Sequence, residues 1–181
     1  MVLKIITERT KLRPLQWSDL NTVHKLHALP ETDAYNTLGI PNNIEETRKV
    51  IAPWIQENEG VAIKNYVLAI ENKIDAEFIG LFGLKLGHEK FKRAEVWYKL
   101  HPDYWNQGIA TEVVSRMIDY CFQTLNLHRI EAGCAVENVA SIKVLEKVGF
   151  IREGIGRQIL PLKSGWSDNY FYAILETDKR K

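Results

Sequence analysis

The sequence lacks most of the features that mark secreted, membrane-spanning or nucleic-acid-binding proteins. Two cysteines among 181 residues are too few for a disulfide-rich scaffold. No apolar run approaches the ~20 residues of a membrane-spanning helix, and the N-terminal string MVLKIITERTK is charged too early for a signal peptide. The formal net charge of +1 gives no reason to expect nucleic acid or an anionic membrane as the main partner. We therefore expect a soluble protein of the cytoplasm.

Internal repeats, low-complexity segments and Pro/Gly/Ser-rich linkers are also absent. With 45% hydrophobic and 26% charged residues, the chain has an ordinary globular composition and enough length to bury a substantial core. We expect a single domain over residues 1–181. Neither Cys121 nor Cys134 belongs to a CxxC or metal-ligand spacing, so both are expected to be reduced and buried. His24 and His27 lie one helical turn apart, but no third ligand accompanies them, and we expect no metal site.

The most informative stretch runs from residue 95 to residue 125 and changes its periodicity in the middle. Its first part, residues 95–100, alternates as a strand. Alternation separates two sets of side chains, with Val96, Tyr98 and Leu100 on one face and Glu95, Trp97 and Lys99 on the other. From Thr111 onward the spacing is that of a helix with one apolar face, formed by Val113, Val114, Met117, Ile118, Cys121, Phe122 and Leu125.

Between this strand and this helix lies the turn Asn106-Gln107-Gly108-Ile109-Ala110-Thr111. Its small residues leave successive backbone N–H groups uncovered, and unpaired donors at a helix N-terminus carry partial positive charge. Such a turn is suited to a phosphate or pyrophosphate group. A plain connection between strand and helix is the alternative, because one Gly and one Ala are a weak signal.

Periodicity and turn residues predict the other elements. Strands are expected at residues 12–15, 66–70, 78–86 and 129–135, with a closing hairpin over 152–175 that turns at Lys163-Ser164-Gly165. Helices are expected after Ser18 as N-cap, from about Asn43, and over 138–148 with Gly149 as the stop. Pro14 favours an edge strand, and Pro53 predicts a kink or a break in the second helix. Gly80 and Gly83 predict a bulge or the close approach of another backbone.

Three separated strings carry a family resemblance. Gly108-Ile109-Ala110 matches the end of the Q/R-x-x-G-x-G/A signature of the GNAT superfamily of N-acetyltransferases, although Trp105 stands where Gln or Arg is usual. The string from His101 to Glu112, the opening Thr7-Glu8-Arg9 with Leu12-Arg13-Pro14, and the closing hairpin resemble the RimJ/RimL branch, so the resemblance runs from Thr7 to Leu175. It implies a mixed α/β (α+β) GNAT fold, with a mostly antiparallel sheet that is splayed at its centre and flanked by helices.

The resemblance implies an acetyl-CoA-dependent N-acetyltransferase that acts on a primary amine. For the RimJ/RimL branch the expected acceptor is a protein N-terminal amine, such as that of a ribosomal protein, and the enzyme is a monomer or a homodimer. A polyamine or an aminoglycoside stays open as the acceptor, because the acidic residues Glu31, Asp33, Glu45 and Glu46 suit a polycation. A non-catalytic acyl-CoA-binding module is the alternative from another class, because Leu145 replaces the Tyr that acts as an acid in many members.

The same resemblance assigns the expected site residues. Glu95 would receive the amine proton, for which a modest base suffices when an α-amine has a pKa of ~7.7–8.0; a surface carboxylate paired with Lys99 is the alternative. Ser141 would assist the departing thiolate, unless it is only a local hydrogen-bonding residue near a helix start. Asn138 would either cap that helix or bind the pantetheine amide. The cofactor contacts would come from Leu100, Asn106, Gln107, Gly108, Ile109, Ala110 and Thr111.

Overall fold

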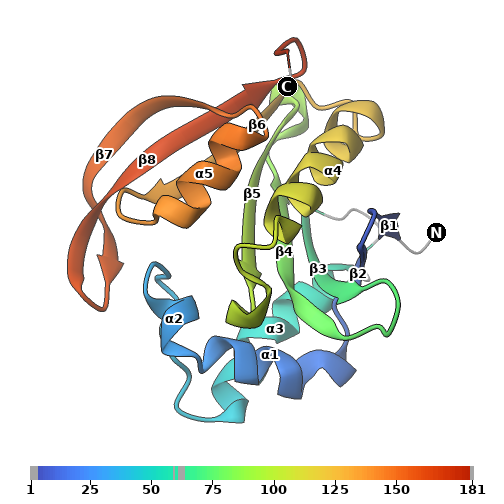
Figure 1. Cartoon of the computed structure of the whole chain (residues 1–181), viewed down its shortest axis with the longest axis vertical. Helices are drawn as coiled ribbons and strands as arrows, with labels where there is room; N and C mark the ends of the chain where they lie inside the picture. Colours follow the sequence, from blue (N-terminus) through green and yellow to red (C-terminus); the bar gives the residue numbers. More distant parts are fainter. Residues whose placement is uncertain (1–3, 59, 61–63, 180–181) are drawn as a thin grey trace.

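The computed structural model describes residues 4–58, 60 and 64–179. Within these ranges, eight strands form one sheet in the order β1-β2-β3-β4-β5-β6-β8-β7 (Figure 1). Neighbouring strands pair antiparallel, with the exception of the parallel pair β5 and β6. The strands are β1 (Ile5–Ile6), β2 (Thr10–Pro14), β3 (Asn65–Asn72), β4 (Phe78–Leu86), β5 (Arg93–Leu100), β6 (Arg129–Ala135), β7 (Ile151–Leu162) and β8 (Gly165–Leu175).

Helices cover both faces of this sheet. The helices α4 (Ile109–Gln123) and α5 (Val139–Lys147) pack on one face, and α1 (Leu20–His27) and α3 (Ile44–Asn58) pack on the other. The short α2 (Pro30–Asp33) follows α1 and lies near the tip of the β7–β8 hairpin (Figure 1). Short 3-10 turns occupy Trp17–Asp19, Glu89–Phe91 and Pro102–Tyr104. Among the described helices, none combines the length and the apolar character needed to cross a bilayer.

Strand alternation divides the core into two clusters, one on each face of the sheet. In β5, Val96 and Leu100 are buried under α4 and α5, and Tyr98 packs against the same cluster. Trp97 instead packs against the cluster under α1 and α3. The predicted division of β5 into two faces is therefore confirmed, and the same strand contributes to both sides of the molecule.

The sheet is continuous on each side of β5 and β6 but opens between them. β4 pairs with β5 from Ala94 to Leu100, and β8 pairs with β6 from Arg129 to Ala135. In contrast, β5 and β6 pair over three residues only, from Arg93↔Arg129 to Glu95↔Glu131. Beyond Glu95 the two strands part, which is the central splay that the family resemblance implied.

Several expected boundaries agree closely with the structure. β6 has the predicted bounds, and the β3–β4 and β7–β8 hairpins lie where they were expected. Gly149 follows α5 with φ of +101°, a left-handed conformation that favours glycine after a helix. Cys121 and Cys134 are both buried and free.

The expected cap of α1 is wrong. Ser18 lies inside the 3-10 turn Trp17–Asp19 and does not cap the helix. Asp19 is the N-cap residue of α1, but its side chain makes no capping bond to that helix. Its Oδ2 instead accepts the N–H of Gln16 at 2.8 Å, at the start of the 3-10 turn, while its two oxygens also bind Arg13. The Asp19 carboxylate therefore binds the backbone and an arginine at the same time.

The effects expected of two prolines also need correction. β2 is not the edge strand, because the two-residue β1 pairs with its first part, opposite Lys11 and Leu12. Pro14 lies beyond that short partner, so its missing N–H removes no ladder bond there. Pro53 does not divide the second helix, because α3 runs through it from Ile44 to Asn58.

Gly80 and Gly83 sit where β5 approaches β4 too closely for a side chain, as was predicted. A Cβ built on Gly80 would lie 2.2 Å from the carbonyl oxygen of Lys99 and 2.8 Å from Cα of Leu100. A Cβ on Gly83 would lie 2.0 Å from the ring of Trp97. Ile79 forms a bulge beside this site, since Ile70 pairs with Gly80 and Glu71 with Phe78.

The substitution Gly80→Ala tests this contact. The obstructing atoms are backbone atoms of β5, which cannot rotate away, so the free energy of unfolding should fall by about 1–3 kcal/mol. The matched control is Gly154→Ala in β7, where a Cβ would meet no atom within 4 Å and the change should stay within about 0.5 kcal/mol. Urea unfolding of the two variants measures both values, and equal stabilities would contradict the packing described.

Candidate active site

The turn between β5 and α4 contains two residues in the left-handed backbone conformation. Asn106 and Gly108 have positive φ angles of +58° and +77°. Gly108 is the N-cap residue of α4, and no described side chain caps this helix. The first amides of α4 therefore remain available as donors, and the helix dipole adds positive potential at the same place. Ile109 is buried and anchors the helix, whereas Asn106 through Gly108 are exposed.

Arg9, which precedes β2, holds this turn in place. Its Nη1 donates to the carbonyl oxygen of Gln107 at 2.8 Å, and its Nε donates to Oε2 of Glu112 at 2.7 Å. The backbone N–H of Arg9 donates to the other carboxylate oxygen of Glu112 at 2.8 Å. Both residues lie within the strings that carry the family resemblance, but the sequence did not predict their contact. They lie 103 positions apart, so no local pattern signals it.

β5 presents an unpaired backbone edge next to this turn, because β6 pairs with it only as far as Glu95. At the end of the edge, the carbonyl oxygen of Leu100 accepts a hydrogen bond from Nε1 of Trp105 at 2.9 Å. Trp105 therefore has a structural role at the position where the family signature has Gln or Arg. An extended chain can pair with such an edge as an added strand. The edge and the bare helix N-terminus together suit an extended molecule with an anionic end.

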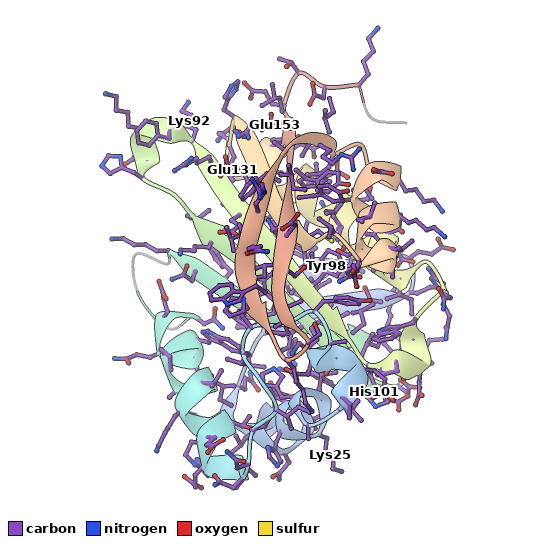
Figure 2. The ribbon with its side chains drawn as sticks, turned by 90° about the vertical axis from the view of Figure 1, so that its left-hand side faces the viewer. Lys25, Lys92, Tyr98, His101, Glu131 and Glu153 are labelled. Atoms are coloured by element: carbon purple, nitrogen blue, oxygen red, sulfur yellow. The ribbon has the colours of Figure 1, made fainter. Side chains whose placement is uncertain are left out.

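Across the opening, α5 brings Ser141 to β5. The Oγ atom of Ser141 lies 2.8 Å from the hydroxyl of Tyr98. Asn138 caps α5, because its Oδ1 accepts the N–H of Ser141 at 3.1 Å. Figure 2 shows Tyr98 between Glu131, near one end of the sheet, and His101, near the other.

Tyr98 is a polar residue of this site that sequence reasoning missed. Burial raises the pKa of its phenol, although the hydrogen bond with Ser141 opposes the shift. Tyr98 therefore stays protonated at neutral pH and can donate its proton to the Ser141 hydroxyl. Leu145 stands where many family members have a tyrosine that acts as an acid, and a leucine cannot donate a proton. Leu145 is 1% exposed and belongs to the core. The only sequence signal for Tyr98 was a hydroxyl on the apolar face of the central strand.

Glu95 lies on the opposite face of β5 from Tyr98 and is exposed. It stands at the last residue pair before β5 and β6 part, opposite Glu131. Glu131 is already held by Arg129 at 2.8 Å and by Arg93 at 3.6 Å. No ion pair among the described residues includes Glu95, so the alternative pairing with Lys99 is not formed.

Beyond Glu95, its face of β5 continues into a partly buried group under α1 and α3. The ring centroids of Trp54 and Trp97 lie 5.6 Å apart. The ring of His27 packs edge-on against Trp54, with a centroid distance of 6.3 Å. Burial lowers the pKa of Lys99 to about 8, and the nearby charge of Asp33 opposes this shift. Burial, with a smaller contribution from Lys99, lowers the pKa of His27 to about 4. His27 is therefore neutral at physiological pH.

Within the described ranges, His24 and His27 do not form part of a metal centre. His24 Nδ1 bonds Thr47 Oγ1 at 2.7 Å, and His27 lies against Trp54. No group of three or more His, Cys, Asp or Glu side chains is arranged there to hold a metal ion.

Comparison with known protein families identifies the family of this chain. The profile described as "Acetyltransferase (GNAT) domain" matches residues 9–151. The chain belongs to the GNAT acetyltransferase family. It is therefore an N-acetyltransferase, and its mixed sheet has the fold of this family.

Individual relatives extend over nearly the whole chain. The uncharacterized N-acetyltransferase p20 of Bacillus licheniformis is 31% identical, covering 96% of this chain and 97% of its own. The ribosomal-protein-serine acetyltransferase of Escherichia coli is 25% identical, with 93% of each chain covered. The crystal structure of the Vibrio cholerae spermidine N-acetyltransferase with CoA and spermine has a TM-score of 0.82 at 25% identity, over 94% of this chain and 97% of that one.

The structure brings the expected site residues together in three places along β5. Leu100 and residues 106–111 lie at its end, Ser141 lies beside Tyr98 on the α4–α5 face, and Glu95 lies on the other face at the start of the opening. Asn138 supports Ser141 through its cap. The acid and base candidates are thus divided between the two faces of one strand.

The substitution Arg9→Met tests whether Arg9 positions the turn. Loss of its two side-chain bonds should weaken CoA binding about 5- to 150-fold, because each such bond contributes roughly 0.5–1.5 kcal/mol. Arg48→Met is the matched control, since Arg48 pairs with Glu45 on α3, away from the turn. Calorimetric titration with CoA measures the dissociation constants, and equal values for both variants would show that Arg9 does not support the site.

Proposed function

We propose that the protein transfers the acetyl group of acetyl-CoA to a primary amine at the opening between β5 and β6. The observation that carries this proposal is the division of β5. Its bare edge and the α4 turn suit an acyl donor, while Glu95 stands on the opposite face at the point where the strands part. Donor and acceptor can then approach from opposite faces and meet in the opening.

The donor is held by backbone rather than by charged side chains. The pyrophosphate accepts hydrogen bonds from the backbone amides of residues 106–111. Arg9 holds this turn in place through its bonds to Gln107 and Glu112. The pantetheine arm pairs along Val96–Leu100 as an added strand. Because the amides are fixed by Gly108 and by the buried Ile109, binding requires little reorganisation.

Glu95 receives the proton that the acceptor amine loses, directly or through water. An exposed carboxylate is a modest base, which is enough for an α-amine whose pKa of ~7.7–8.0 leaves part of it neutral. This match favours a protein N-terminal amine over a lysine side chain with a pKa of ~10.4. A ribosomal-protein N-terminus is the proposed example, because one relative bears the name ribosomal-protein-serine acetyltransferase.

Ser141 stabilises the departing thiolate, and Tyr98 supports Ser141. When the Tyr98 hydroxyl donates to Ser141 Oγ, the Ser141 hydroxyl can turn its own proton toward the CoA sulfur. A thiolate whose conjugate acid has a pKa of ~8.5 needs only such weak assistance. Ser141 and Tyr98 together take the role of the tyrosine acid, whose usual position on α5 is occupied here by Leu145.

The substitution Glu95→Gln tests the base. Release of free CoA from acetyl-CoA in the presence of a primary amine should slow about 100-fold at saturation, because general-base catalysis contributes roughly 10²–10⁴. Acetyl-CoA affinity should not change. Glu89→Gln, in the exposed turn before β5, is the control. Unchanged turnover of the Glu95 variant at saturating substrates would remove this residue from the mechanism.

Tyr98→Phe and Ser141→Ala form a second test. Both variants should lower kcat while leaving KM for the amine nearly constant, with the larger loss in Ser141→Ala because Ser141 contacts the sulfur. If Tyr98 acts through Ser141, the double variant should be no slower than Ser141→Ala alone. Additive losses in steady-state kinetics would contradict this order of action.

A further inference from the structure

A cavity of about 370 Å³ lies between the end of α2, the loop after it, and the tip of the β7–β8 hairpin. Its walls include Asp33, Asn36 and Thr37 from one side and Leu162 and Lys163 from the other. Figure 1 shows the same arrangement of elements, with α2 close to the hairpin tip. The loop and the hairpin tip are far apart in sequence, so the cavity exists only in the folded chain.

Asp33 is the unusual member of this wall. Its side chain belongs to a residue that is only 4% exposed, and its Oδ1 has no hydrogen-bond partner among the described residues. The other buried carboxylates in the described ranges, Glu71 and Asp19, form ion pairs with cations. Glu71 contacts Lys11 at 2.7 Å and Arg13 at 2.6 Å, and Asp19 contacts Arg13 at 2.8 Å. A buried carboxylate is costly without a donor, so Asp33 is expected to serve a ligand rather than the fold.

Lys99 interacts with Asp33 through its charge, but it forms no ion pair with the carboxylate. The charge of Asp33 favours the protonated form of Lys99, yet the two residues form no ion pair within 4.0 Å. This coupling connects the cavity to β5 on the face that carries Glu95. Lys99 lies four residues after Glu95, or about 13 Å along an extended strand.

We propose that Asp33 binds a second, protonated amine of the acceptor, several bonds away from the amine that is acetylated. This inference rests on the proposed function and names its substrate class: an amine that carries a separate alkylammonium group. Free polyamines and the side chain of a lysine near a protein N-terminus both supply this chemistry. Lys163 sits at the exposed hairpin tip, where water screens its charge, so it does not exclude a cation from the enclosed carboxylate.

Two amines of equal length test the proposal directly. With the wild-type protein, kcat/KM for hexane-1,6-diamine should exceed that for hexylamine by about 10- to 100-fold, because a charge-assisted hydrogen bond distinguishes them. In Asp33→Asn the preference should fall close to one, while hexylamine turnover and acetyl-CoA affinity stay unchanged. Glu31→Gln, an exposed carboxylate of the same helix α2, is the control and should keep the preference.

The outcomes separate this inference from the proposed function. Equal turnover of the two amines by the wild-type protein would overturn the role of Asp33 while leaving the acetyltransferase mechanism standing. An equal loss for both amines in Asp33→Asn would also overturn it, because Asp33 would then serve only as a counter-charge to Lys99. Acetyl-CoA binding without turnover of any primary amine would contradict the proposed function itself.

The source of the ammonium group is resolved by a second comparison. Spermidine is measured beside two N-terminal peptides that differ only in lysine or norleucine at the second position. A preference for the lysine peptide that Asp33→Asn abolishes identifies a protein acceptor, and the same behaviour with spermidine identifies a polyamine. Insensitivity of all three acceptors to Asp33→Asn would overturn the proposal.

Discussion

The structure depends on one interruption of backbone pairing, the parting of β5 from β6 after Glu95. Each strand keeps a full partner on its outer side, β4 for β5 and β8 for β6, so the sheet stays intact while it opens in the middle. The opening exposes an edge of β5 inside the molecule, where a backbone edge would otherwise be unsatisfied. An extended chain that paired with this edge would complete the sheet.

Elements on both sides stabilise the opening and give it chemical direction. Strand alternation sends Tyr98 toward α5 and Ser141, and it sends Glu95 and Trp97 toward the α1–α3 side. The candidate base Glu95 and the candidate acid Ser141 therefore lie on opposite faces of β5. Arg9 connects the segment before β2 to the α4 turn.

Sequence reasoning predicted the parts of this site that local patterns encode. The alternation of residues 95–100, the apolar face of α4 and the glycine turn at Gly108 all follow from spacing alone. Contacts between distant segments could not be read in this way. Arg9 with Glu112, Tyr98 with Ser141 and the exposed setting of Glu95 depend on the order of strands in the sheet. The bonds of Asp19 to Arg13 and to the backbone of Gln16 were also missed, because Arg13 comes from β2, and periodicity carries no record of such a partner.

The most direct test of the account is backbone amide exchange across β5 with and without CoA. If the donor pairs with the open edge, amides within Val96–Leu100 that face the opening should exchange more slowly when CoA is bound, together with those of the first turn of α4. Amides of residues 169–175 in β8, which pair with the whole length of β6, should change little. Protection confined to other parts of the chain, with Val96–Leu100 unaffected, would contradict the claim that the donor occupies the opening between β5 and β6.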